Sequence, residues 1–245
     1  MWSEVLTGVI TAAIVGTGGY AFGRRTSVRR AVLRKNPILI HIEQDPGIIY
    51  GNMPAWIAFP YFIPRQSSDV PPPPSGQGIW PLTAWWRWSM ELGGYPSGYV
   101  DLQVTLTAWD DLTVLIDRFR VTAISVENPE SGTTVLRPTG GADISLRQLE
   151  VKLNTFVSRV TPRAAGSGEE VPTFAFQLKA GETERFLLHI RAGDDAECYE
   201  WSGFLDLLVN NERKTVEIDD SGKKFKIRKM TTFCDWRDEA WQTHS

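Results

Sequence analysis

Apolar and polar residues alternate along much of the chain from Tyr99 onward, which is the pattern of half-buried β-strands. In the first run every second residue from Val100 to Ala108 is apolar, and the residues between them are polar. This period of two places one set of side chains on each face of a strand. Similar runs follow at 112–126, 144–153, 174–178, 184–191, 201–209, 215–218 and 223–227. The pattern therefore predicts about eight strands.

Turn-forming residues separate these runs. Clusters rich in Gly, Asn, Asp and Pro lie at 128–132, 139–141, 180–182, 193–195 and 219–222. Short strands joined by such turns, with no long amphipathic helix, predict a mainly β fold. We expect an immunoglobulin-like antiparallel β-sandwich, although no family signature accompanies the architecture.

The first 35 residues have a different pattern. An uncharged stretch of 18 residues runs from Val5 to Phe22. As an α-helix it would be roughly 27 Å long, close to the ~30 Å hydrocarbon core of a bilayer. We predict a single N-terminal transmembrane helix as the anchor, within residues 1–23.

Six cationic residues follow the apolar stretch, namely Arg24, Arg25, Arg29, Arg30, Arg34 and Lys35. The positive-inside rule then predicts a cytoplasmic C-terminal domain and an outside N-terminus in the inner (cytoplasmic) membrane. A cleavable signal would carry its charges before the apolar region. The basic segment 24–35 either lies along the inner leaflet or is only the topological signal.

Gly8, Ala12 and Gly16 recur every four residues and form a candidate helix-packing face. Such a face would allow another backbone to approach closely in the membrane. The alternative is the ordinary abundance of small residues in membrane helices.

Residues 36–97 form a Pro- and Trp-rich region that we expect to be irregular with short strands. It holds 11 of the 15 prolines and five of the ten tryptophans. Proline removes a backbone donor and restricts its neighbour, so only short extended pieces such as 38–42 are expected. The tryptophans Trp80, Trp85, Trp86 and Trp88 either pack against the following domain or form a binding surface for a sugar, a lipid headgroup or a protein.

The β-sandwich is expected at 98–230 and a C-terminal tail at 231–245. The tail contains Phe233, Trp236 and Trp241, which would make a short helix or an extended flap. It either folds onto the sandwich or is available to a partner.

Charge and cysteine content restrict the function further. The chain carries −3 overall, and residues 1–35 carry six basic residues and one acidic residue, or +5, which leaves −8 for residues 36–245. We therefore expect no nucleic-acid binding, which needs a concentrated basic surface. A basic run at 223–229 is expected to be a solvated edge strand. Cys198 and Cys234 should be free thiols in a reducing cytoplasm but a disulfide candidate outside it.

No motif for chemistry is present. The three histidines His41, His189 and His244 have no nearby carboxylate or cysteine at metal-ligand spacing, and His189 alternates onto the solvent face of a predicted strand. The pairs Asp110–Asp111 and Asp194–Asp195 lie where turns are expected. We therefore expect no catalytic residues, no metal and no cofactor, and do not expect an enzyme.

These features favour a membrane-anchored docking or scaffolding protein. Its cytoplasmic β-sandwich would be presented to a protein partner, to a larger complex or to a second copy of the chain, and the bilayer would be its other contact. The alternative is a membrane-tethered ligand sensor or carbohydrate-type binding domain that uses the Trp-rich surface.

Overall fold

The computed structural model describes residues 36–50, 59–74, 82–109, 112–127, 129–137, 147–164, 169, 171 and 173–244. Contacts divide the chain into the units Met1–Pro37 and Ile38–Ser245. All elements described below belong to the second unit.

The first sheet has five strands in the order β1-β4-β10-β7-β8. Their bounds are β1 Ile38–Glu43, β4 Tyr99–Ala108, β10 Thr183–Arg191, β7 Arg147–Lys152 and β8 Arg159–Arg163. All neighbours are antiparallel except β7 and β10, which are parallel.

The second sheet contains β12 Glu212–Ile218, β11 Cys198–Val209, β5 Val114–Ser125 and β9 Phe176–Leu178 in that order. A fifth strand, β13 Phe225–Arg228, pairs with the first residues of β11, and β12 pairs with the rest of it. Because β5 occupies the other side of β11, β12 and β13 follow one another along the same edge.

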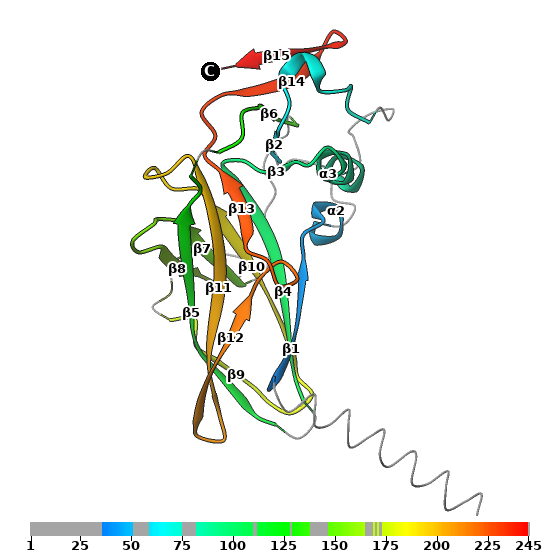
Figure 1. Cartoon of the computed structure of the whole chain (residues 1–245). Coiled ribbons are helices and arrows are strands. Elements are labelled where there is room, and N and C mark those ends of the chain that lie inside the picture. Colours follow the sequence, from blue (N-terminus) through cyan, green and yellow to red (C-terminus); the bar gives the residue numbers. More distant parts are fainter. Residues whose placement is uncertain are drawn as a thin grey trace, which may run out of the picture. The chain divides into compact units, whose positions relative to one another are not determined.

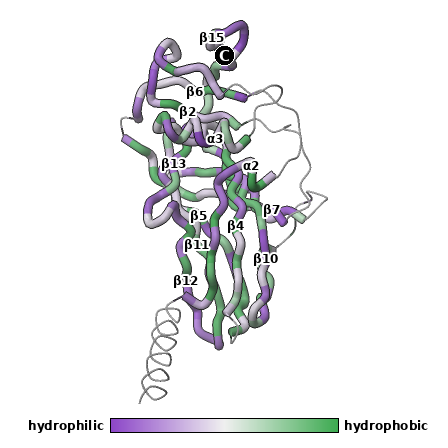
Figure 2. Tube along the Cα trace, turned by 90° about the vertical axis from the view of Figure 1, so that its right-hand side faces the viewer, coloured by the Kyte–Doolittle hydropathy of each residue, from purple (hydrophilic) through white to green (hydrophobic). Residues whose placement is uncertain are grey.

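The two large sheets lie face to face (Figure 1). One apolar core contains residues of both sheets. Alternate residues of β4 and β10, such as Leu102, Val104 and Leu188, meet residues of β5 and β11, such as Phe119 and Trp201. The alternation of apolar and polar residues along the long strands is visible in Figure 2. Burial of one face of each sheet is the main source of stability in such a layered arrangement.

Strand register defines two ends of this pair of sheets. At one end, Ile38 pairs with Ala108 and Thr183 pairs with Thr107 in the first sheet. At the same end, Val114 pairs with Val209 in the second sheet. At the other end, Arg191 pairs with both Tyr99 and Lys152. We call these the Ile38 end and the Arg191 end; the ten residues of β4 separate them by roughly 33 Å.

A third, smaller sheet has the order β15-β14-β6-β2-β3. Its strands are β2 Tyr61–Ile63, β3 Tyr95–Pro96, β6 Thr133–Val135, β14 Phe233–Arg237 and β15 Ala240–His244. It connects to the Arg191 end, where the Gly98 N–H donates to the Arg228 carbonyl over 2.7 Å. Four regions far apart in sequence therefore form one sheet.

Three short helices accompany the third sheet, namely α2 Pro46–Ile49, the 3₁₀ helix η1 Ser67–Asp69 and α3 Leu82–Glu91. In α3 the buried residues Leu82, Trp85 and Ser89 follow the helical period. The helix ends where Gly93 takes a positive φ of 77° and Gly94 N–H donates to Ser89 O over 2.9 Å, an arrangement that satisfies terminal carbonyls.

The prediction of a mainly β fold is confirmed, and each predicted strand run overlaps a strand of the structure. Two expectations need correction. The sheets are not wholly antiparallel, because β7 and β10 run parallel, as do β6 and β14. The Trp-rich region is not only irregular, since residues 82–91 form a helix that buries Trp85.

The predicted C-terminal tail contains the hairpin of β14 and β15 rather than a helix. Asp238 and Glu239, at its turn, take positive φ values of 51° and 60°, which matches the twist of a tight hairpin. Cross-strand packing of Trp236 against Trp241, with ring centroids 5.2 Å apart, stabilises this pairing.

Within the described residues, no helix has the length and apolar character needed to cross a membrane. The expected anchor at 1–23, its flanking cations and the Gly8, Ala12 and Gly16 face all lie outside the described residues.

Candidate functional site

A loop at the Arg191 end exposes two large apolar side chains. This loop, residues 153–158, joins β7 to β8, and we call it the Phe156 loop. Phe156 is 91% exposed and Val157 is 80% exposed. Apolar side chains exposed to this extent lose the stabilisation that burial would supply, about 1.5–3 kcal/mol each.

The backbone of the Phe156 loop is held by its own polar groups. Asn154 Oδ1 accepts hydrogen bonds from the N–H groups of Phe156 and Val157, at 2.9 and 3.1 Å. The hydroxyl of Ser158 accepts from Asn154 N–H at 3.2 Å. Asparagine favours such local turns because its side chain replaces a backbone acceptor. The two apolar side chains are thus presented from an ordered backbone.

A second set of contacts joins this loop to the turn between β10 and β11. Asp195 Oδ2 accepts from both the N–H and the hydroxyl of Thr155, at 2.8 and 2.6 Å. Its other oxygen accepts from the Tyr199 hydroxyl at 2.7 Å. Together these bonds lower the pKa of Asp195 to about 2, and the bond from the Thr155 hydroxyl has the largest effect. The carboxylate is therefore a structural brace for the loop.

Beside the loop is an open pocket of about 490 Å³, whose lining includes Lys152, Val157, Arg159 and Asp194. Lys152 Nζ lies 2.6 Å from Asp194 Oδ2, and its hydrogen bond lowers the pKa of that carboxyl. Asp194 and Asp195 thus have ion-pair and turn partners, which agrees with the expected turn role of this pair. The pocket combines an apolar rim with charged groups, as protein-docking surfaces do.

A second polar cluster lies on the outer face of the first sheet. His189 Nδ1 lies 2.6 Å from Asp101 Oδ1, and the Tyr50 hydroxyl donates to Asp101 Oδ2 over 2.5 Å. Asp101 is buried and His189 is partly exposed. Burial lowers the pKa of His189, but the hydrogen bond and charge of Asp101 outweigh it, so the pKa is raised overall.

No local sequence pattern indicates this pair, because Asp101 and His189 are 88 residues apart. His244 likewise has a carboxylate partner, with its Nε2 2.8 Å from Asp235 Oδ1. Both pairs depend on strand pairing rather than on local spacing. Among the described residues, no group of three or more His, Cys, Asp or Glu side chains could hold a metal ion.

The candidate tryptophans that the structure describes differ in how deeply they are buried. Trp85 is fully buried and donates through Nε1 to the Phe59 carbonyl over 3.0 Å. Trp88 stacks between Trp85 and Trp241, with centroid distances of 4.9 and 6.0 Å. Trp86 is partly buried against the same apolar cluster, and Trp80 lies outside the described residues. The geometry of Trp85 and Trp88 is that of core packing.

Both cysteines are buried and free. Cys198 is 1% exposed in β11 and Cys234 is 3% exposed in β14. Burial raises the pKa of the Cys198 thiol, so it is a poor nucleophile.

Comparison with known proteins adds little. No protein-family model and no curated protein sequence matches this chain. A solved structure titled "X-ray structure of Northeast Structural Genomics Consortium target SoR45" is 10% identical, with a TM-score of 0.25, over 79% of this chain and 87% of that chain. Similarity at this level indicates neither family nor function.

Proposed function

We propose that this chain is a membrane-anchored docking protein that binds a protein partner through the Phe156 loop. The anchor is the apolar stretch 5–22 with the cations that follow it. The domain beyond it is cytoplasmic by the positive-inside rule. For its architecture we propose an immunoglobulin-like sandwich, supported by the two sheets with a shared core, although β7 and β10 pair in parallel.

The observation that carries this proposal is the ordered exposure of Phe156 and Val157. A loop that is merely a connection gains nothing from holding an aromatic ring 91% exposed on a hydrogen-bonded backbone. A docking loop does gain, because a pre-ordered apolar contact costs less entropy on binding. An aromatic side chain surrounded by polar groups is a common centre of binding energy.

The ends of the domain support the same arrangement. Ile38 begins β1 only three residues after Lys35, so the chain arrives from the proposed anchor at the Ile38 end. The Phe156 loop follows Lys152, which pairs at the Arg191 end. The anchor attachment and the proposed docking loop are therefore at opposite ends of β4, roughly 33 Å apart.

The docking proposal predicts a site-specific cross-link. A photo-crosslinking amino acid placed at Val157 of the full chain, expressed at native level in its own membranes, should form one discrete adduct. The same group at Ile48, which is 61% exposed on α2, is the matched control and should form none. Phe156→Ser should reduce the Val157 adduct at least fivefold, because the neighbouring apolar contact is lost. Equal adducts from both positions, or none from Val157, would reject the loop as the docking site.

The side of the membrane on which the domain lies can be tested by thiol labelling. The test requires an introduced cysteine, because the two native thiols are buried. Lys224→Cys places a thiol on an exposed turn before β13. We expect a membrane-impermeant maleimide to label this variant only after the cells are opened, while the wild-type chain stays unlabelled in both conditions. Efficient labelling in intact cells would place the domain outside and overturn the cytoplasmic assignment.

The alternative function, a ligand sensor with a Trp-rich surface, gains no support from Trp85 and Trp88, which pack internally. Trp86 and Trp88 are both only partly buried on α3, but Trp88 is stacked between Trp85 and Trp241.

A further inference from the structure

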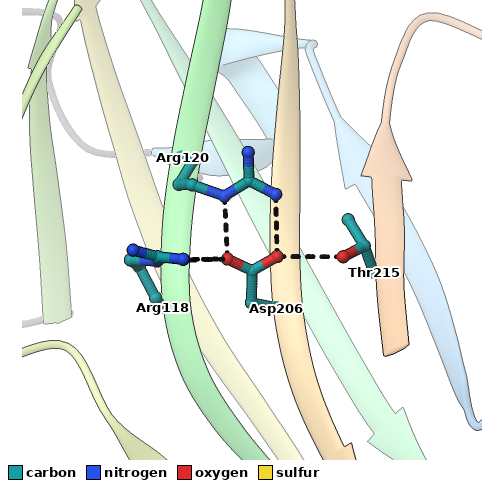
Figure 3. A network of polar contacts seen from close by, with 4 residues as sticks. All are labelled: Arg118, Arg120, Asp206 and Thr215. Carbon is teal, nitrogen blue, oxygen red and sulfur yellow. Dashed lines mark hydrogen bonds and ion pairs between the residues drawn. The ribbon is translucent and has the colours of Figure 1, made fainter. Parts of the chain in front are cut away.

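A cluster of cations lies on the outer face of the second sheet, where two arginines of β5 converge on one aspartate of β11. Arg120 donates to Asp206 through Nε and Nη2, both at 2.8 Å, and Arg118 donates through Nε at 3.1 Å (Figure 3). Thr215 of β12 donates to the same carboxylate over 3.0 Å. A break in register leaves Asp117 unpaired between Ile116 and Arg118. The carboxylate holds both guanidinium groups in place.

The charges of this cluster do not cancel. The hydrogen bond from Arg120 holds the pKa of Asp206 well below its usual range, so one negative charge faces two guanidinium groups. Arg213, Lys214 and Asp117 line the same pocket. Four cations and two carboxylates give +2 here, whereas residues 36–245 carry −8. An excess of positive charge on an acidic domain attracts an anion to this face.

The size and lining of the pocket indicate which kind of anion would fit it. It has a volume of about 300 Å³, and Leu115 and Leu208, which are partly exposed, contribute apolar surface beside the cations. The Arg118 side chain is 65% exposed, so a ligand can reach it from solvent. Guanidinium groups bind phosphate through paired hydrogen bonds. A phosphate joined to an apolar group therefore fits better than a free inorganic ion.

The pocket also lies toward the end of the domain at which the chain enters. Arg213 and Lys214 are in the first residues of β12, directly after the turn that follows Val209, and Val209 pairs with Val114 at the Ile38 end. Ile38 is three residues after Lys35, the last cation of the proposed anchor flank. This step rests on the proposed membrane anchor, which would keep the Ile38 end near the headgroups.

We propose that the face formed by Arg118, Arg120, Arg213 and Lys214 binds the phosphate of an anionic phospholipid in the membrane that holds the anchor. The cations contact the phosphate, and the leucines contact the adjoining carbon atoms. The acidic domain is then attracted to the bilayer at this one face, which would orient the Phe156 loop away from the membrane.

The test is a titration of the full-length chain, held in an uncharged amphipol, with dihexanoyl phosphatidic acid below its micelle concentration. Calorimetry should show saturable binding that weakens as salt is raised. Dihexanoyl phosphatidylcholine and inorganic phosphate are the comparison ligands, and both should bind at least tenfold more weakly. Equal binding of inorganic phosphate would overturn the assignment to a lipid.

Single substitutions separate this face from general electrostatics. Arg213→Gln, which breaks no ion pair described in the structure, should weaken phosphatidic acid binding about fivefold, and Arg118→Gln should do the same. Asp117→Asn should strengthen it. Lys224→Gln removes the same charge from an exposed turn outside the pocket and should leave affinity unchanged. Equal losses in Arg213→Gln and Lys224→Gln would refute a localised site.

The outcome is distinguishable from failure of the proposed function. The titration does not require the chain to be inserted in a membrane, and alkaline extraction of native membranes tests the anchor by itself. A chain that resists extraction but does not bind phosphatidic acid contradicts the lipid site alone. A chain that is extracted contradicts the anchor, whatever the titration shows.

Discussion

Trp85→Ala is expected to lower the free energy of unfolding by about 3–5 kcal/mol. The side chain is fully buried beneath the third sheet, and its indole N–H donates to the Phe59 carbonyl. Its loss leaves a cavity next to Trp88 and an acceptor without its donor. Thermal unfolding of the full chain, followed by tryptophan fluorescence, measures the effect.

Trp86→Ala is the matched control, because it removes the same residue type from the neighbouring position of the same helix. Trp86 is only partly buried, so Trp86→Ala should lower the free energy of unfolding by about a third as much as Trp85→Ala. The stacking of Trp88 on Trp241, and the bond from Trp241 Nε1 to the Val70 carbonyl at 3.1 Å, extend the cluster to the C-terminal hairpin. Trp85→Ala should therefore also speed proteolysis of β15. Similar effects of the two substitutions would contradict the core assignment of Trp85.

The second large effect is expected at the buried carboxylate of the first sheet. Asp101→Ala removes the partner of both the Tyr50 hydroxyl and the His189 ring. Two polar groups then lack their bonds, and Tyr50 is buried. We expect a loss of about 3 kcal/mol in unfolding free energy. Asp101→Asn, which keeps an acceptor of the same size, should lose less.

The same pair predicts a pH dependence. Groups from three strands face His189: Asp101 and Tyr99 from β4, Glu150 from β7 and Arg191 from β10. Tyr50, directly after α2, binds the other oxygen of Asp101. The pKa of His189 is raised by folding, so its protonated form contributes stability below the unfolded pKa of about 6.5. That contribution is lost as pH rises through the higher folded pKa.

The melting temperature of the wild-type chain should therefore fall as pH rises above about 6.5, through the raised pKa of His189, and His189→Gln should flatten this part of the profile. The ring is partly exposed, so the change will be small, on the order of 1 kcal/mol or less after solvent screening. His41→Gln is the control, since His41 lies exposed on β1. A slope that is the same in all three chains would contradict the role of His189.

Local pattern was enough to find the strands of the two large sheets except β8, at Arg159–Arg163, where no alternating run was recognised. From Val100 to Ala108 the alternation predicted β4, and the structure buries Leu102, Val104 and Leu106 as expected. The parallel pairing of β7 with β10 was not predictable in this way, because alternation specifies which face is buried but not which strand is adjacent. The helix at 82–91 was missed because ten residues crowded with tryptophan also fit an irregular packed segment.

Local sequence pattern indicated even less about the candidate sites than about the sheets. No sequence pattern indicated that Phe156 and Val157 would be exposed, since an apolar pair after a strand usually belongs to a core. Arg118 and Arg120 were visible as charges, but their convergence on Asp206 spans more than 80 residues and follows from the pairing of β5 with β11. His189 was placed on an outer face without its partner Asp101.

The sequence by itself determined the mainly β class, the strand runs, and the contrast between a basic N-terminal segment and an acidic remainder. These follow from periodicity and charge, which are local or additive properties of the chain. Only the tertiary structure decided which residues meet. It joined 61–63, 95–96, 133–135 and 233–244 in one sheet, buried Trp85, exposed Phe156 and brought Arg118 to Asp206. Those outcomes depend on long-range strand pairing, whose energy comes from contacts that no local window of sequence contains.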